Sequence, residues 1–230
     1  MDSERFRIIP RKKGQLLYPL LMAFMYISAF ALIIFSEKIN IVYFLVYILA
    51  TSLGFTYLEF HQWKSGWKKL EEASGLALED NSLLGIMKTQ KLTGKYRGYP
   101  IEIDGYSVGL GRYRKHYTKV EIELPETLKG SFSLTKRGFW QKNLETTGIE
   151  EFDQRFNFSS DMDWVADRLF RNREIEDGMY DLHAQCRTLQ LSATDKQLFF
   201  QERGRIKDSE YLMALLDFLI KMTGMIKQNN

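Results

Sequence analysis

One glycine-rich stretch carries most of the residues that could do chemistry. It runs from Gly105 to Leu124, GYSVGLGRYRKHYTKVEIEL, and places three glycines directly before a cluster of basic residues. Loops that hold phosphate need glycines at a fixed spacing and a helix that begins behind them. The three glycines match neither the Walker nor the dinucleotide spacing, and an alternating, strand-like run follows them. The stretch is therefore predicted to be a connection into a strand, while Arg112, Arg114 and Lys115 are candidates for contact with lipid headgroups or another anion.

No metal, cofactor or nucleophile site is predicted. His183 and Cys186 have the spacing of half a metal site, but a zinc site needs two further ligands and the other histidines lie far away in the sequence. Cys186 is the single cysteine and lacks the local signature of a catalytic thiol. Asp161 and Asp163 are explained by a helix start, where carboxylates are favourable. The expected set of cofactors is therefore empty.

Two long apolar runs precede this part of the chain. They cover Leu16–Phe35 and Ile39–Leu58, and neither contains a charged residue. A helix of about 20 residues spans roughly 30 Å, the thickness of the hydrocarbon core of a bilayer. A pair of buried core helices is the alternative, but such helices rarely run this long without a polar face. The runs predict a transmembrane helical hairpin joined by Ser36–Lys38.

Positive charge collects beside these runs. Residues 1–69 hold nine Lys or Arg against four Asp or Glu, a balance of +5, and the remaining residues balance to −2. Because Lys and Arg favour the cytoplasmic side, we expect a multi-pass protein of the cell membrane with both termini cytoplasmic. The orientation in the membrane thereby explains the excess of positive charge in residues 1–69, and no nucleic-acid partner is expected. Four aromatic residues at the end of the second run are expected to be membrane-interface anchors: Tyr57, Phe60, Trp63 and Trp67.

The residues that follow predict an α+β domain of antiparallel strands with two or three helices and a C-terminal helix. Alternating apolar residues predict strands on both sides of Arg97-Gly98, over Tyr117–Leu124 and on both sides of 193–196, and a further strand over 150–158. Ser and Asp residues at 159–163 predict a helix start, and 208–227 has the pattern of an amphipathic helix.

These elements divide the chain into four parts. Residues 1–15 are a basic cytoplasmic N-terminus and 16–60 are the transmembrane hairpin. Residues 61–80 are a juxtamembrane helical linker, and 81–230 are the cytoplasmic α+β domain. About 150 residues are enough for a domain to bury its own core.

The order of these features resembles a loose group of uncharacterised prokaryotic membrane proteins. The likeness rests on the apolar hairpin, on Trp63 and Trp67 after it, and on EFDQRFNFSSDMDWVADRLF at 151–170. The resemblance implies an N-terminal transmembrane hairpin and a cytosolic α+β domain, and it implies no reaction and no catalytic residues. A strand-rich domain closed by a C-terminal helix also looks like membrane-tethered bacterial pleckstrin-homology-like domains, from which the helical segment 160–185 departs.

The functional prediction is a membrane-anchored cytoplasmic interaction domain that binds a protein partner or lipid headgroups. The bilayer is the first expected partner. Self-association is the next, because Ala50 and Gly54 would permit close packing of helices. Two alternatives stay open: a membrane-tethered enzyme with an unrecognised active site, and a subunit or assembly factor of a larger membrane complex. Polar residues converging in a deep pocket would favour the enzyme, and an exposed apolar patch would favour partner binding.

Overall fold

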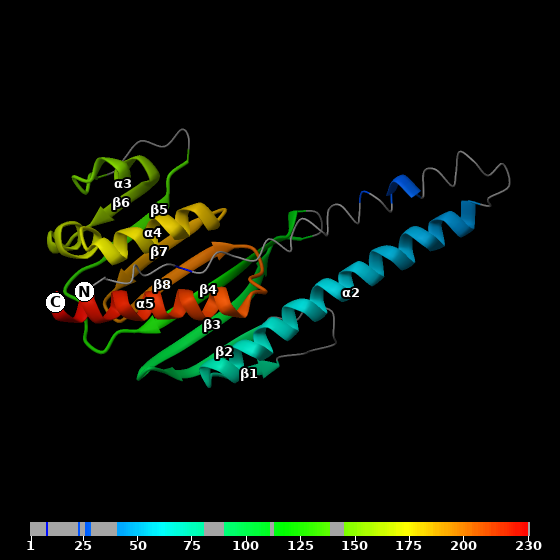
Figure 1. Cartoon of the computed structure of the whole chain (residues 1–230), viewed down its shortest axis with the longest axis horizontal. Coiled ribbons are helices and arrows are strands. Elements are labelled where there is room, and N and C mark those ends of the chain that lie inside the picture. The colour runs from blue at the N-terminus through cyan, green and yellow to red at the C-terminus, as the bar shows by residue number, and fades with distance from the viewer. Residues whose placement is uncertain are drawn as a thin grey trace, which may run out of the picture.

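A computed structural model describes residues 8, 23, 26–28, 41–80, 90–110, 113–138 and 145–229. The long elements of this part of the chain are one sheet and three helices (Figure 1). The helices and the π-helical segment are α2 (Ile41–Ser74), α3 (Glu150–Arg155), η3 (Val165–Phe170), α4 (Arg173–Gln185) and α5 (Ser209–Asn229). The strands are β1 (Ala77–Asp80), β2 (Gln90–Tyr96), β3 (Tyr99–Val108), β4 (Lys115–Glu123), β5 (Phe132–Lys136), β6 (Phe156–Ser160), β7 (Leu189–Thr194) and β8 (Gln197–Arg203).

The eight strands found in the described ranges form a single antiparallel sheet. Their order is β1-β2-β3-β4-β8-β7-β5-β6, so the late hairpin β7–β8 inserts between β4 and β5. The turn between β2 and β3 has positive φ at both Arg97 and Gly98, which matches the right-handed twist of a two-residue hairpin. In β4, Val120 and Ile122 are buried opposite Phe200 and Leu198 of β8. Period-2 alternation of this kind gives the sheet one apolar face and one open face.

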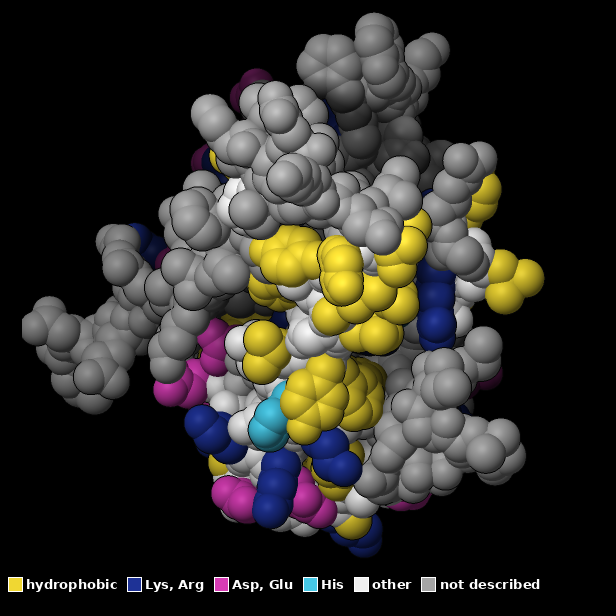
Figure 2. Space-filling view, turned by 90° about the vertical axis from the view of Figure 1, so that its right-hand side faces the viewer, with side chains coloured by type: hydrophobic (Ala, Val, Ile, Leu, Met, Phe, Trp, Pro, Cys, Tyr) yellow, Lys and Arg dark blue, Asp and Glu magenta, His cyan; other side chains and the backbone are white. Residues whose placement is uncertain are grey.

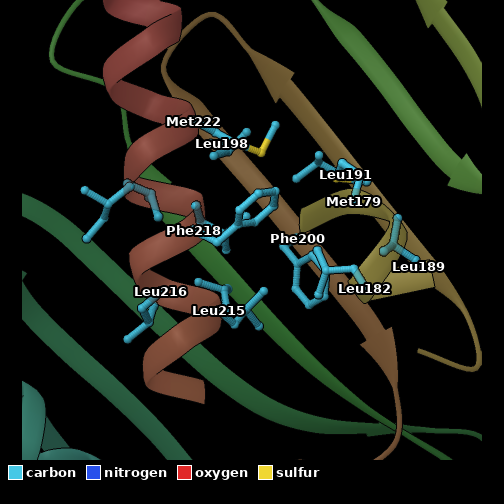
Figure 3. Packing of buried hydrophobic residues seen from close by; sticks show 14 of the residues in the cluster. Met179, Leu182, Leu189, Leu191, Leu198, Phe200, Leu215, Leu216, Phe218 and Met222 are labelled. Carbon is cyan, nitrogen blue, oxygen red and sulfur yellow. The ribbon is translucent and has the colours of Figure 1, made fainter. Parts of the chain in front are cut away.

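Helices cover only the apolar face of the sheet. The C-terminal half of α2 and the helices α4 and α5 lie over it, as Figure 1 shows. In Figure 3, Phe218 and Met222 of α5 point toward Leu198 of β8. Met179 and Leu182 of α4 lie on the side of this cluster that faces away from α5. All five side chains are at most 1% exposed. The core is therefore a layer between the sheet and these helices, and within the described residues no helix covers the other, open face of the sheet.

Short polar contacts define where α4 and α5 begin. The Asn172 side chain accepts hydrogen bonds from the backbone N–H groups of Glu174 and Ile175 at the start of α4. The Asp208 carboxylate accepts from the N–H groups of Glu210 and Tyr211 at the start of α5. Such caps satisfy backbone donors that a helix leaves unpaired, and each contributes about 1 kcal/mol.

The prediction of a strand over 150–158 is wrong for its first part. The helix predicted to start at 159–163 begins a few residues later, because β6 continues to Ser160 and η3 starts at Val165. Residues 150–155 form α3, and β6 begins only at Phe156. The Asp153 carboxylate accepts hydrogen bonds from the N–H and the hydroxyl of Thr147, which holds the preceding loop against α3. Phe152 and Phe156 meet with ring centroids 4.6 Å apart. The alternation of aromatic residues predicts a strand here. The structure is instead decided by contacts between near neighbours in the sequence, Thr147 with Asp153 and Phe152 with Phe156.

The predicted N-terminal transmembrane hairpin is wrong, and with it the predicted multi-pass membrane localisation with both termini cytoplasmic. Of the residues that the structure describes, none belong to a helix that combines the length and the apolarity needed to cross a bilayer. The second predicted span does not end at Leu58, because α2 continues as one helix to Ser74. The prediction from hydropathy considered the apolar run alone. The same helix continues into a half that carries charged residues on one side and packs its apolar side, with Trp63 and Trp67, in the core. The first predicted span, Leu16–Phe35, lies outside the described residues apart from Ala23 and Tyr26–Ser28.

The C-terminal half of α2 is a structural part of the domain. Trp63 and Trp67 are 1% and 0% exposed and pack edge to face with ring centroids 5.6 Å apart. The Trp67 indole N–H donates to the backbone carbonyl of Ile206 at 2.9 Å. Residues 61–80, predicted to be a linker, thus form the buried end of α2 and the edge strand β1. The division of the chain at residues 15, 60 and 80 stays a prediction.

Two glycines let α2 approach the rest of the domain closely. A Cβ at Gly66 would overlap the backbone carbonyl of Lys207. A Cβ at Gly105 of β3 would lie 2.7 Å from the ring of Trp63 and 3.3 Å from the ring of Trp67. These contacts leave no room for a methyl group, so any side chain at either position would clash with its neighbours. We call this set of contacts, formed by Trp63, Gly66, Trp67, Gly105 and Ile206–Lys207, the α2 joint.

The close approach at Gly66 predicts a loss of stability in Gly66→Ala. The added methyl group must push α2 away from rigid backbone, and overpacking of this kind costs about 1–3 kcal/mol. The matched control is Gly224→Ala in the interior of α5, where nothing lies within 4 Å of the added Cβ. Alanine is the better helix former by roughly 0.5–1 kcal/mol, so the control should keep or gain stability. Urea unfolding of the full chain measures the stability of both variants. Equal unfolding midpoints would contradict the close packing of α2 against Lys207.

Candidate functional site

The connection between β3 and β4 is a tight loop whose shape depends on Gly109. It joins Val108, the last residue of β3, to Lys115, the first of β4. Gly109 has φ 90°, in the left-handed region that favours glycine, and a Cβ there would lie 2.8 Å from the Tyr113 carbonyl oxygen. Tyr113 donates its backbone N–H to the Leu110 carbonyl at 3.1 Å. The glycine-rich stretch is thus a turn that leads into a strand, as its spacing predicted.

The end of this hairpin exposes apolar and basic side chains together. Val108, Leu110 and Tyr113 are 54%, 83% and 70% exposed. Arg114 and Lys115 directly follow them and are also exposed. We call the described residues 108–110 and 113–115 the tip. Arg112, the third basic residue singled out from the sequence, lies outside the described residues.

The base of the tip is held by side-chain contacts across the two strands. Tyr106 stacks on Tyr117 with ring centroids 5.5 Å apart and an interplanar angle of 22°. The Tyr106 hydroxyl donates to the Gln201 side chain at 2.8 Å, and burial raises the pKa of Tyr106. Ser107 and His116 also share a hydrogen bond of 2.7 Å. The hairpin is therefore stiff up to the residues that it exposes.

The N-terminal half of α2 adds a larger apolar surface at the same end of the molecule. Figure 1 shows it projecting beyond the sheet on the side where the β3–β4 hairpin ends. Its large apolar side chains that are more than half exposed are Val42, Tyr43, Leu45, Val46, Leu49, Leu53, Tyr57 and Leu58. Figure 2 looks onto this end and shows apolar side chains at its centre with Lys and Arg side chains beside them. An apolar surface of this extent indicates a contact with something outside the described residues.

The four predicted interface anchors separate into two groups. Tyr57 is 67% exposed on the projecting half of α2, and Phe60 is partly buried against the core. Trp63 and Trp67 belong to the α2 joint, and Arg205 lies over the Trp63 ring at 4.9 Å. The boundary between surface and core on α2 therefore falls between Tyr57 and Trp63.

The open face of the sheet carries an ion-pair ladder on β2, β3 and β4. The Lys91 Nζ lies 3.0 Å from Glu102, and the Lys119 Nζ lies 3.8 Å from Glu102 and 3.2 Å from Glu121. The hydrogen bond with Glu102 raises the pKa of Lys91, and burial raises the pKa of the neighbouring Asp104. Exposed pairs contribute at most about 1 kcal/mol each, so the ladder mainly favours one strand register.

Of the residues considered for metal binding and nucleophilic chemistry, Cys186 is buried in the core and His183 is partly buried. The Cys186 thiol donates to Glu202 at 3.0 Å, and the Tyr211 hydroxyl donates to the same oxygen at 3.2 Å. Burial and the positive charge of Lys136 lower the pKa of His183, whose ring packs edge to face against Phe156 with centroids 5.3 Å apart. In the part of the chain described here, no three His, Cys, Asp or Glu residues are placed to hold a metal ion. Sequence reasoning missed the fully buried Glu202, although the alternation of β8 places it on the core face.

Comparisons with known proteins give one distant likeness. No family model and no curated protein matches this chain. Among solved structures, the crystal structure of the mycobacterial trehalose monomycolate transport factor A, TtfA, is similar to 70% of this chain and 90% of its own, with 12% sequence identity and a TM-score of 0.43. A likeness at this level carries no conclusion about the fold or the role of the present chain.

Proposed function

We propose that this protein binds a surface of anionic lipid headgroups through the tip. The observation that carries the proposal is the composition of the tip: three exposed apolar side chains, Val108, Leu110 and Tyr113, directly precede two exposed cations, Arg114 and Lys115. Apolar residues that enter the headgroup region and cations that meet phosphate are the two contributions by which a surface loop binds lipid.

Rough magnitudes show how the apolar and the charged contributions divide the work of binding. A Lys or Arg near an anionic surface contributes about 1 kcal/mol, so two give about 2 kcal/mol, or roughly 30-fold in affinity. Removing a large apolar side chain from water contributes about 1.5–3 kcal/mol when burial is complete. The apolar residues of the tip therefore supply most of the affinity, and the cations select an anionic surface. The stacked pair Tyr106–Tyr117 supports this role because a stiff hairpin loses little entropy on binding.

The proposal predicts that charge reversal at the tip weakens binding to anionic vesicles. Arg114→Glu/Lys115→Glu should reduce binding of the full chain to phosphatidylcholine vesicles that contain phosphatidylglycerol by at least about 30-fold, since attraction is replaced by repulsion. Vesicle flotation measures the bound fraction. Binding of the unaltered chain should also fall as salt is added, because counterions screen the exposed cations.

The matched control is Lys95→Glu/Lys196→Glu. Both lysines are exposed and lie at the far end of the sheet, because Lys95 pairs with Pro100 at the start of β3 and Lys196 lies beside Leu124 after β4. The control changes the net charge as much as the tip variant does, so it should bind vesicles as the unaltered chain does. Equal losses in the two variants would show a general charge effect and contradict a site at the tip.

Self-association through α2 is a second candidate function, favoured by a different observation. Val46, Leu49 and Leu53 follow one another at helical spacing and are 58%, 62% and 61% exposed. Gly54 has open space around the position of a Cβ, so another helix could approach its backbone. A second copy of the same chain would present the same apolar surface and cover this one, as in a two-fold dimer.

This second candidate predicts that Leu49→Gln/Leu53→Gln weakens dimerisation. Losing about 1.5 kcal/mol at each position amounts to about 3 kcal/mol, which raises the dissociation constant at least about 100-fold. Sedimentation velocity over a range of protein concentrations measures the change. Leu110→Gln removes an even more exposed leucine from the tip and is the control, with no expected effect on the dimer. A monomeric unaltered chain at the highest concentration would reject self-association.

A further inference from the structure

A shallow hollow lies on the open face of the sheet, away from the tip. It is open to solvent and has a volume of about 370 Å³, and strands β5, β6 and β7 form its floor. The lining includes Ser133, Ser159, Ser192 and Thr194. The volume falls within the range of about 300–1,000 Å³ that is usual for small-molecule sites.

The strand register places the hydroxyl groups of the floor in one row. Ser133 of β5 pairs with Ser159 of β6 on one side and with Ser192 of β7 on the other. Ser192 in turn pairs with Phe199 of β8. Directly paired residues point to the same face, and neighbouring strands lie about 4.8 Å apart. The floor therefore presents three hydroxyls in a line, and beyond the edge of the hollow the same row continues to the partly buried ring of Phe199.

Some hydroxyl groups in and beside this row are available to bind a ligand. Ser159 donates to Glu145 at 3.2 Å, and the Ser131 hydroxyl donates to Asp161 at 3.2 Å. Within the described ranges, the side chains of Ser133, Ser192 and Thr194 make no hydrogen bond, yet each is exposed or partly exposed. Hydroxyls donate and accept, so they can pair with hydroxyls of a ligand in either direction.

The charge of the hollow selects against anions. Glu145 and Asp161 belong to the lining, and the described residues of the lining include no Lys, Arg or His. A phosphate or carboxylate there would meet two negative charges without compensation. A neutral ligand rich in hydroxyls would instead donate to the carboxylates and to the free serines, and its ring could lie on Phe199.

We propose that this hollow is a binding site for a neutral carbohydrate. The row Ser159–Ser133–Ser192 holds ligand hydroxyls, the two carboxylates accept further hydrogen bonds, and Phe199 provides an apolar platform for a sugar ring. The site goes beyond the lipid-binding function and is independent of it, because no tip residue belongs to the lining. Either site can therefore fail its test while the other passes.

Isothermal titration of the full chain with maltotriose, cellotriose and chitotriose tests the proposal. At least one should bind with a dissociation constant in the millimolar range or below, so titration to about 20 mM is sufficient. Ser133→Ala/Ser192→Ala should weaken that binding by about 5- to 30-fold, since two hydrogen bonds are lost. Ser65→Ala/Thr56→Ala on α2 removes two hydroxyls elsewhere and should change nothing.

Three outcomes would overturn the site. The first is that none of the three saccharides binds. The second is that the serine variant and its control bind a saccharide equally well, which would place the contact elsewhere. The third is that glucose 6-phosphate binds more tightly than glucose, because the two carboxylates of the hollow exclude a preference for an anion.

Discussion

The α2 joint is the contact on which the arrangement of this protein depends. Two buried indoles, Trp63 and Trp67, fill the space that Gly105 leaves on β3, and one of them donates a hydrogen bond to Ile206. Gly66 brings the helix backbone against Lys207 at the same place. The joint fixes the direction in which α2 leaves the domain, because the helix is continuous from Ile41 to Ser74. The projecting apolar half of α2 and the tip are consequently presented in a set relation to each other (Figure 1).

The sheet separates two kinds of surface that serve different chemistry. Its helix-covered face is apolar and forms the core, while its open face is divided along the strand order. The half formed by β2, β3 and β4 carries the ion-pair ladder around Glu102, and the half formed by β5, β6 and β7 carries neutral hydroxyls around Ser133. The tip lies at the end of the charged half. Lipid headgroups and a neutral sugar would therefore meet separate regions, each with the charge that suits it.

Regular local patterns in the sequence were enough to predict much of the sheet. The alternation over Tyr117–Leu124 matches β4, and the pattern over 208–227 matches α5. The prediction was wrong where a pattern could not reveal what lies beside it. The apolar run that begins at Ile39 was interpreted alone, whereas packing against residues distant in sequence makes α2 one helix that ends in the core. The hollow was missed for the same reason, because its serines lie on three strands that only the sheet order brings together.

The joint also constrains the order in which the chain can fold. Trp67 and Ile206 are 139 residues apart in the sequence, so the indole has no acceptor until most of the protein has left the ribosome. Contacts of such long range close late, and they slow folding because the chain entropy of a large loop must be lost first. Until then, the apolar side of α2 that carries Trp63 and Trp67 can contact Gly105 of β3 but lacks the part of the joint formed by Ile206–Lys207. A nascent chain of this design is most prone to aggregate just before its C-terminal third is complete.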